Sequence, residues 1–240
     1  MEELSTKLVE WIRDQVNRSQ RRGVVFGLSG GIDSSVIAVL CKRSFPNNTL
    51  ALIMPCYSSS SDVEDASLIA DKYNIPSMTI NLNRAYSELL DSFPKNISSP
   101  NIQKIAEANI KPRLRMTTLY FFANKLMYLV VGTTNRSEIA IGYCTKYGDS
   151  GVDITPLGNL LKCEVRDLAR HLDIPENIIE KPPSAGLWEG QTDEEEMGIT
   201  YEQLDRYLQC GQASEEIMQK IDSLNIASSH KRMLPPSPPF

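Results

Sequence analysis

The chain has 240 residues, of which 41% are hydrophobic and 23% are charged, and its formal net charge is −5. This length and composition are typical of a globular domain with a sizeable core, so we expect residues 1–240 to form a single domain. The negative balance provides no general basic field, so we expect no nucleic-acid partner, and an anionic ligand must bind at a local cluster of cations.

The sequence gives no sign of a targeting or membrane segment. No apolar run approaches the roughly 20 residues that span a bilayer, and the start, "MEELSTKLVEWIRDQV", lacks the regions of a signal peptide. The five cysteines are scattered and form no CxxC pair, which disfavours a disulfide or metal framework. We therefore expect a cytoplasmic protein with reduced thiols and no membrane partner.

Helical and strand patterns alternate along the chain. Leucine, tryptophan, isoleucine and valine at helical spacing predict a helix from residue 4 to 16. Short apolar runs predict buried strands at 23–28, 49–55, 76–82 and 128–134. The segments predicted as helices after the first strand are 34–45, 61–74 with Ser61 as N-cap, 84–93, 102–127 with a break near Asn109 caused by Pro112, 136–143, 160–172, 201–210 and about 214–229. Residues 94–101, 144–159 and 181–198 are predicted as loops.

This alternation predicts an α/β fold: a doubly wound parallel sheet with helices on both faces. Ligands of such sheets bind beyond the C-terminal ends of the strands. The loops after Leu28, Ile53, Leu82 and Thr134 should therefore lie along one edge of the sheet.

The loop "SGGIDSS" (29–35) follows a predicted strand and opens a helix. Helix N-termini bind anions, Gly30 and Gly31 allow a close approach of the backbone, and Ser29 and Ser34 add hydroxyl donors. Asp33 would repel a phosphate unless a divalent cation lies between them, and Mg²⁺ favours carboxylate and phosphate oxygens. The alternative is a tight strand-to-helix turn in which Asp33 and Ser34 are only capping residues.

The SGGxDS pattern resembles the signature of the ATP pyrophosphatases, which cleave ATP between its α and β phosphates. Three further segments resemble the NAD synthetase family, and together they extend over nearly the whole chain. They are "NIKPRLRM" (109–116), "VVGTTNRSEIAIGYCTKYGDSGVDITPLGNLLKCEVRDLA" (130–169) and "KPPSAGLWEGQTDEEEMG" (181–198). Pro112 and Ser150 depart from the family pattern, and Pro112 could alter how Arg113 is presented.

The resemblance implies a set of site residues. It assigns ATP to Gly27, Leu28, Ser29, Gly30, Gly31, Ile32, Asp33, Ser34, Thr133, Lys162 and Ser184, with Asp33 and Lys162 as catalytic residues. It assigns the deamido-NAD substrate to Arg113, Lys146, Asp153, His230 and Lys231, and Mg²⁺ to Asp33 and Glu138.

Several of these residues have a simpler interpretation. Asn135 and Glu138 form a capping-box pattern, which explains Glu138 without a ligand. Arg113 and Arg115 could be solvated, and the 144–153 segment is polar enough to be an exposed loop. Lys162 at a helix start is mildly unfavourable next to the helix dipole, which favours a ligand.

The resemblance implies an ammonia-dependent ligase of NAD biosynthesis that forms NAD, AMP and pyrophosphate through an NAD-adenylate. It also implies a homodimer, ATP as co-substrate and Mg²⁺ as cofactor. The length of the loop at 181–198, with Leu187 and Trp188 in it, predicts a lid that excludes water. The length leaves no room for the amidase domain of glutamine-dependent relatives, so we expect free ammonia or a partner to supply nitrogen. The alternatives are a GMP synthetase-like amidotransferase and a non-catalytic adenine-nucleotide-binding module.

Overall fold

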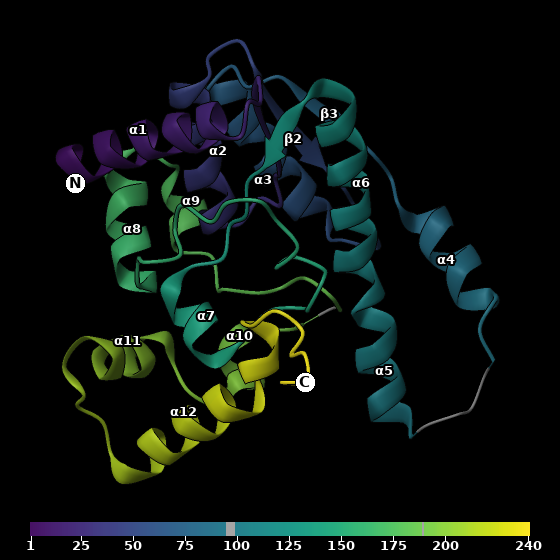
Figure 1. The fold of residues 1–240 in the computed structure, drawn as a ribbon, viewed down its shortest axis with the longest axis vertical. Helices are drawn as coiled ribbons and strands as arrows, with labels where there is room; N and C mark the ends of the chain where they lie inside the picture. Colours follow the sequence, from purple (N-terminus) through teal and green to yellow (C-terminus); the bar gives the residue numbers. More distant parts are fainter. Residues whose placement is uncertain (95–98, 189) are drawn as a thin grey trace.

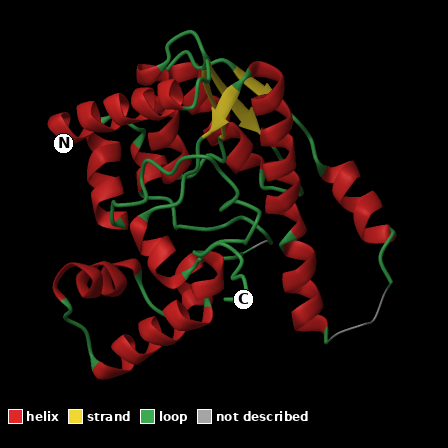
Figure 2. Ribbon diagram, in the orientation of Figure 1, coloured by secondary structure: helices red, strands yellow, loops and turns green. Residues whose placement is uncertain are grey.

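The computed structural model describes residues 1–94, 99–188 and 190–240. Within these residues, four parallel strands form one sheet in the order β3-β2-β1-β4 (Figure 2). They are β1 (Gly23–Gly27), β2 (Thr49–Ile53), β3 (Ser77–Thr79) and β4 (Tyr128–Val130). An isolated parallel bridge from Val131 to Ile154 extends the edge beyond β4. The sheet class predicted from the sequence is confirmed.

Helices connect and surround the strands (Figure 1). In chain order they are α1 (Glu2–Arg18), α2 (Ile32–Ser44), α3 (Ser60–Lys72), α4 (Asn83–Asp91), α5 (Pro100–Ala108), α6 (Ile110–Leu126), α7 (Arg136–Ile141), α8 (Lys162–His171), α9 (Glu176–Ile179), α10 (Asp193–Met197), α11 (Tyr201–Cys210), α12 (Glu215–Ala227) and the 3₁₀ turn η1 (Ser229–Lys231). None of the helices in the described ranges is long and apolar enough to cross a membrane.

Two apolar cores cover the two faces of the sheet. Because strand side chains alternate between faces, Val24 and Phe26 of β1 pack with α1, α2, α3, α8 and α9. Val25 points the other way and packs with Leu119 and Ala123 of α6. Helices on both faces therefore bury both sides of the parallel sheet, as parallel strands require.

A third cluster joins the helices beyond the carboxyl ends of the strands. Ile141 of α7 packs with Met197, Tyr201, Leu204 and Ile221 of α10, α11 and α12. Figure 1 shows α11 and α12 as a separate layer at the end of the molecule opposite α1. The layer encloses one side of the edge where the sequence places the ligand.

The structure corrects several details of the predicted elements. Ser59 rather than Ser61 caps α3, because the Ser59 side chain accepts the Ser61 N–H. The 181–198 segment contains the short helix α10, which Thr192 caps and four acidic residues favour at its start. The strands are shorter than predicted, and α9 and η1 were not predicted. The predicted loop at 94–101 lies partly outside the described residues.

Other local predictions are confirmed. The predicted break near Asn109 separates α5 from α6, and Pro112 lies in the first turn of α6, where its missing N–H costs no helical hydrogen bond. The Asn135–Glu138 pair forms the predicted capping box, and the structure adds a second capping box of Thr200 and Gln203 at the start of α11.

Candidate active site

The loop from Leu28 to Gly31 turns β1 into α2 at the carboxyl edge of the sheet. Ser34 Oγ lies 3.0 Å from Ser29 Oγ and donates to the Gly31 carbonyl at 2.9 Å, which fixes the loop in a tight turn. Among the described residues, no side chain caps the N-terminus of α2. The first N–H groups of the helix therefore remain free to receive an anion.

The predicted ATP-binding residues in this loop have different environments. Leu28 and Ile32 have buried side chains that belong to the core, so only their backbone can face a ligand. Gly30 has φ +83°, and a Cβ there would lie 2.4 Å from the Asp62 carbonyl oxygen of α3. Gly30 is thus required by backbone conformation and by the close approach of α3. Gly31 meets only Ser29 Oγ at 3.5 Å and leaves open space beside the helix start.

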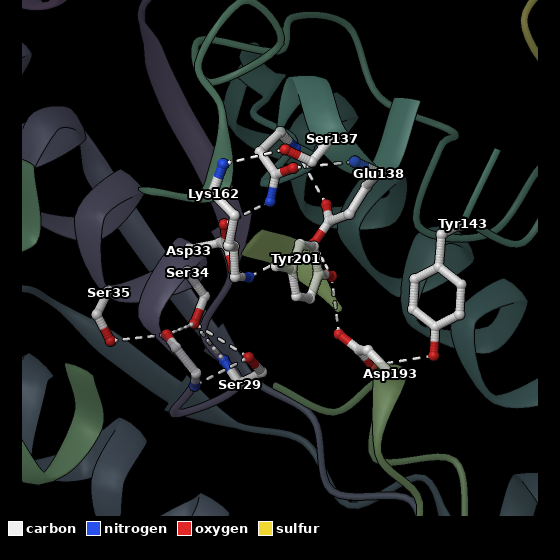
Figure 3. A network of polar contacts seen from close by, with 12 residues as sticks. Ser29, Asp33, Ser34, Ser35, Ser137, Glu138, Tyr143, Lys162, Asp193 and Tyr201 are labelled. Carbon is white, nitrogen blue, oxygen red and sulfur yellow. Dashed lines mark hydrogen bonds and ion pairs between the residues drawn. The ribbon is translucent and has the colours of Figure 1, made fainter. Parts of the chain in front are cut away.

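Asp33, Glu138 and Lys162 meet in a buried ionic centre (Figure 3). The Lys162 ammonium lies 2.5 Å from Asp33 Oδ2 and 3.6 Å from Glu138 Oε1. Its side chain is 3% exposed, and those of Asp33 and Glu138 are 17% and 14% exposed. The three come from helices that follow β1, β4 and the Val131–Ile154 bridge, so the parallel sheet brings together residues more than a hundred positions apart.

Asn135 shows that capping and site geometry use the same residues. Its side chain accepts the Glu138 N–H at 3.0 Å, and the Asn135 N–H donates to Glu138 Oε2 at 3.0 Å. The Asn135 side-chain amide also donates to Asp33 Oδ1 at 3.0 Å. The capping box therefore turns the other oxygen of Glu138 toward Lys162 while it orients Asp33.

The charges of this centre perturb one another. Burial, together with the Asp33 carboxylate, raises the pKa of Glu138 to about 8, although Lys162 opposes the shift. Burial lowers the pKa of Lys162, but the carboxylates of Asp33 and Glu138 outweigh burial, so the pKa lies above its usual value. Lys162 is therefore a cation, and the centre holds an excess of acidic groups over this ammonium.

Two residues from other elements fix the start of α8 and with it Lys162. The Lys162 N–H donates to Ser137 Oγ at 3.0 Å, and the Cys163 N–H donates to Asp205 Oδ2 at 2.8 Å. Ser137 in turn donates to Asp205 Oδ1 at 2.5 Å. Asp205 of α11 is buried and supplies negative charge at the helix N-terminus. This cap could not be read from the sequence, because Asp205 lies 42 positions away from Cys163.

Tyrosines connect the centre to α10. The buried Tyr201 hydroxyl donates to Asp193 Oδ2 at 3.0 Å and lies 3.4 Å from Glu138 Oε1, while its ring lies 5.0 Å from the Lys162 ammonium. The Tyr143 hydroxyl donates to Asp193 Oδ1 and Glu196 Oε2, both at 2.9 Å. Burial raises the pKa of Asp193, although both tyrosines and Lys162 lower it. No pattern in the sequence points to a role for Tyr143, Asp193 or Tyr201.

The residues predicted to hold deamido-NAD lie in a second group. Arg113 is exposed on α6 and donates to the Lys146 carbonyl at 3.3 Å, and Lys146 donates to the His230 carbonyl at 2.6 Å. Lys231 donates to the carbonyls of Gly142 and Cys144, both at 2.8 Å. The C-terminal turn η1 is thereby held against the end of α7. The structure brings Arg113, Lys146 and His230 together as an exposed basic group.

Asp153 has a clear structural role beside this group. Its carboxylate accepts the Tyr120 hydroxyl at 3.0 Å and the Val130 N–H at 2.8 Å. The carboxylate thus ties the end of β4 to α6, and its assignment to substrate remains a prediction. Thr133 is half-buried in the loop between β4 and α7, and Ser184 is exposed and accepts the Gly186 N–H at 3.1 Å.

The predicted lid, residues 181–198, is held by lysines at its start and middle. Lys181 forms ion pairs with Asp62 at 2.7 Å and Asp65 at 2.6 Å on α3. The buried Lys111 of α6 donates to the Leu187 carbonyl at 2.7 Å. These contacts attach residues 181–187 to α3 and α6.

The centre provides two carboxylates for a divalent metal ion, Asp33 and Glu138, so a bound metal would need further ligands from elsewhere. In the described ranges, no group of three or more His, Cys, Asp or Glu residues is arranged to hold a metal. Asp33 and Glu138 nevertheless flank one ammonium with buried oxygen ligands, beside an uncapped helix N-terminus. Oxygens of this kind suit Mg²⁺ when phosphate oxygens complete its coordination.

Known proteins are similar to this chain in sequence and in fold. The NAD synthase family profile matches residues 4–235. The chain is 50% identical over 237 residues to the NH(3)-dependent NAD(+) synthetase of Carboxydothermus hydrogenoformans, which covers 99% of this chain and 97% of the relative.

Two solved structures extend the comparison. An NMN synthetase from Francisella tularensis has a TM-score of 0.93 and 41% identity, covering 100% of this chain and 98% of that chain. An NH3-dependent NAD synthetase from Campylobacter jejuni has a TM-score of 0.80 and 30% identity, and the match covers 98% of this chain and 97% of that chain.

Proposed function

Because the chain belongs to the NAD synthase family, we propose that it amidates deamido-NAD with ammonia, using ATP and yielding NAD, AMP and pyrophosphate. The observation that carries this proposal is the buried centre of Asp33, Glu138 and Lys162 beside the uncapped N-terminus of α2. Such a centre suits a triphosphate, because the free N–H groups of a helix N-terminus and a nearby ammonium both stabilise phosphate charge.

The reaction has two balanced steps. First, a nicotinate carboxylate oxygen attacks the α-phosphorus of ATP, the bond from that phosphorus to the bridging oxygen breaks, and pyrophosphate leaves with both electrons. Ammonia then attacks the acyl carbon of the resulting adenylate, the bond to AMP breaks, and the nitrogen loses a proton as the amide forms. No protein nucleophile is needed, so the enzyme acts through position and charge.

The named residues have distinct tasks in this proposal. The Ser29–Ser34 loop and the free N–H groups of α2 hold the phosphates that leave. The Lys162 ammonium turns from Asp33 to phosphate oxygens, and the lid at 181–198 keeps water from the adenylate, with Thr133 and Ser184 contacting ATP. Arg113, Lys146, Asp153, His230 and Lys231 bind the dinucleotide.

Mg²⁺ is part of the proposal, held by Asp33 and Glu138. When bound, it supplies neutralisation of phosphate charge. The buried acids favour it, because Asp33, Glu138 and Asp193 surround the ammonium of Lys162 and all influence its pKa. A divalent cation would favour the ionised form of Glu138, whose pKa is about 8 in its absence, and would release Lys162 to the phosphates.

We further propose a cytoplasmic homodimer in which residues 1–240 act as one domain. Apolar side chains on α5 and α6 support an interface: Ile102 is 61% exposed, Ile105 is 53% exposed and Phe121 is 59% exposed. Exposed apolar groups concentrated on neighbouring helices favour burial against a second protein surface. Sedimentation of the purified protein tests the dimer, and a monomer at micromolar concentration would contradict it.

A second candidate is nicotinate mononucleotide as the acid substrate. The likeness to the Francisella NMN synthetase is greater than that to the Campylobacter NAD synthetase, which favours testing it. The same two steps apply, because the reacting carboxylate is the same. Only the contacts that hold the adenylate half of the dinucleotide would be lost.

One assay tests both candidates. The purified protein receives ATP, Mg²⁺ and ammonium with either deamido-NAD or nicotinate mononucleotide, and AMP and the amidated product are measured. We expect the higher kcat/KM with deamido-NAD. A higher value with the mononucleotide would establish the second candidate, and formation of neither product would contradict both.

A further inference from the structure

Asp193 lies near the end of the predicted lid, where it meets Pro183 near the start. We call these two residues the neck of the lid. The Asp193 N–H donates to the Pro183 carbonyl at 2.9 Å, which brings the two ends of the intervening segment together. Its side chain is buried and accepts hydrogen bonds from Tyr143 and Tyr201. Burying a carboxylate costs free energy unless hydrogen bonds satisfy it. The two tyrosine hydroxyls therefore stabilise Asp193, and with it the neck, in this position.

Tyr201 contacts both the neck and the ionic centre. Its hydroxyl is shared between Asp193 and Glu138, and its ring lies against the Lys162 ammonium. Its N–H donates to Glu194 of α10 at 2.9 Å, so the backbone of α11 is also attached to the lid. Figure 3 shows the Tyr201 ring between Lys162 and Asp193. A movement of the neck therefore displaces a group that touches Glu138.

We propose that Tyr201 is a positioning residue that couples Asp193 of the predicted lid to the orientation of Glu138 as a ligand of the metal–ATP complex. With the neck in place, Asp193 holds the Tyr201 hydroxyl beside Glu138 Oε1, and the Asn135 cap holds Oε2. Both oxygens of Glu138 are then fixed before the metal–ATP complex binds. The inference rests on the proposed function, because it assumes that Glu138 serves this complex.

Tyr143 provides a matched control in the same network. Its hydroxyl also donates to Asp193, at 2.9 Å, but its second partner is Glu196 of α10 rather than Glu138. Tyr143→Phe and Tyr201→Phe each remove one hydrogen bond from the same buried carboxylate. Only Tyr201→Phe also removes the hydroxyl beside Glu138, so the two variants separate anchoring of the lid from orientation of Glu138.

The test measures metal binding without catalysis. Mn²⁺ replaces Mg²⁺ as the probe, ATP is present, deamido-NAD is absent, and free Mn²⁺ is followed by its electron paramagnetic resonance signal. Tyr201→Phe is expected to raise the Mn²⁺ Kd about 10-fold, the effect of losing a partner of a metal ligand. Tyr143→Phe is expected to leave the Mn²⁺ Kd unchanged while it raises the Kd of ATP measured by calorimetry.

The outcomes separate this inference from the proposed function. Equal Mn²⁺ Kd values for wild type and Tyr201→Phe, or an equal rise in both tyrosine variants, overturn the coupling. Wild-type protein that binds no Mn²⁺ in the presence of ATP contradicts the proposed function itself. Should Tyr201→Phe fail to fold by circular dichroism, Asp193→Asn replaces it: a rise in the Kd of both Mn²⁺ and ATP supports the coupling, and a change for ATP alone overturns it.

Discussion

The buried ionic centre and the exposed basic group differ in how their charged side chains are paired. In the centre, Lys162 pairs with both Asp33 and Glu138, and the side chains of Asn135 and Tyr201 contact the two carboxylates. In the basic group, Arg113 and Lys146 donate to neighbouring backbone carbonyls, and Arg113 is exposed while Lys146 is half-buried. The first is built by the fold before any ligand arrives, whereas the second is a surface that a ligand must complete. We infer that the centre sets the chemistry and that the basic group sets the substrate.

The largest effect should come from the centre. Asp33→Ala is expected to lower kcat about 1,000-fold, because it removes a carboxylate aimed at the metal–phosphate complex and leaves Lys162 without its nearest partner. Circular dichroism should show an intact fold, since Asp33 is partly exposed and lies at a helix start. Asp14→Ala is a suitable control, because it removes an exposed ion pair to Arg18 on α1. Full activity in Asp33→Ala would remove this residue from the site.

The basic group should affect binding rather than chemistry. Arg113→Gln is expected to raise the KM for deamido-NAD about 10-fold with little change in kcat or in the KM for ATP. The control is Arg206→Gln, an exposed arginine paired with Glu202 on α11. A fall in kcat at saturating substrate would show that Arg113 takes part in the chemical step, and would weaken the division between the two regions.

A smaller effect should follow from the cap of α8. Asp205→Asn is expected to lower the free energy of unfolding by about 2 kcal/mol, because a buried acceptor of two hydrogen bonds gains a donor that has no partner there. It should also lower kcat a few-fold, since the start of α8 carries Lys162. Urea unfolding and steady-state kinetics measure both. Asp222→Asn, which alters an exposed contact with Tyr207, should change neither.

The last expected effect is a dependence of stability on pH. The folded pKa of Glu138, about 8, lies above the roughly 4.3 of an unfolded glutamate. Between these values the folded state binds more protons than the unfolded state, so stability falls as pH rises through that window. Without metal and ATP, Glu138→Gln should flatten the decline of Tm from pH 5 to 8. An unchanged slope would show that Glu138 is ionised throughout, and Glu202→Gln is the exposed control.

The sequence predicted the main residues of the site but not the residues that hold them in place. The Gly-rich turn, the parallel sheet implied by alternating elements and the Asn135–Glu138 cap all follow from local patterns, and Lys162 was expected at a helix start. The two interpretations of Glu138 both hold locally, because one oxygen serves the cap while the other lies near Lys162. Local patterns are visible because the residues that interact are neighbours in the chain.

Tertiary contacts explain what the sequence could not show. Asp205 caps a helix that begins 42 positions earlier, and Tyr201 reaches Glu138 across 63 positions. Neither belongs to a local motif. The short helix α10 did carry a signal, since Thr192 precedes four acidic residues and Gly198 ends the helix with φ +68°. Five helical residues are too few to show a periodicity, so this segment was predicted as a loop.

The most direct measurement of the central claim is an experimental structure of the protein with Mg²⁺ and ATP bound. We predict that the metal contacts carboxylate oxygens of both Asp33 and Glu138, with the phosphates at the Ser29–Ser34 loop. The Lys162 ammonium should then lie on phosphate oxygens, with Tyr201 still between Glu138 and Asp193. A metal bound away from both carboxylates, with Lys162 still paired to Asp33, would contradict the account.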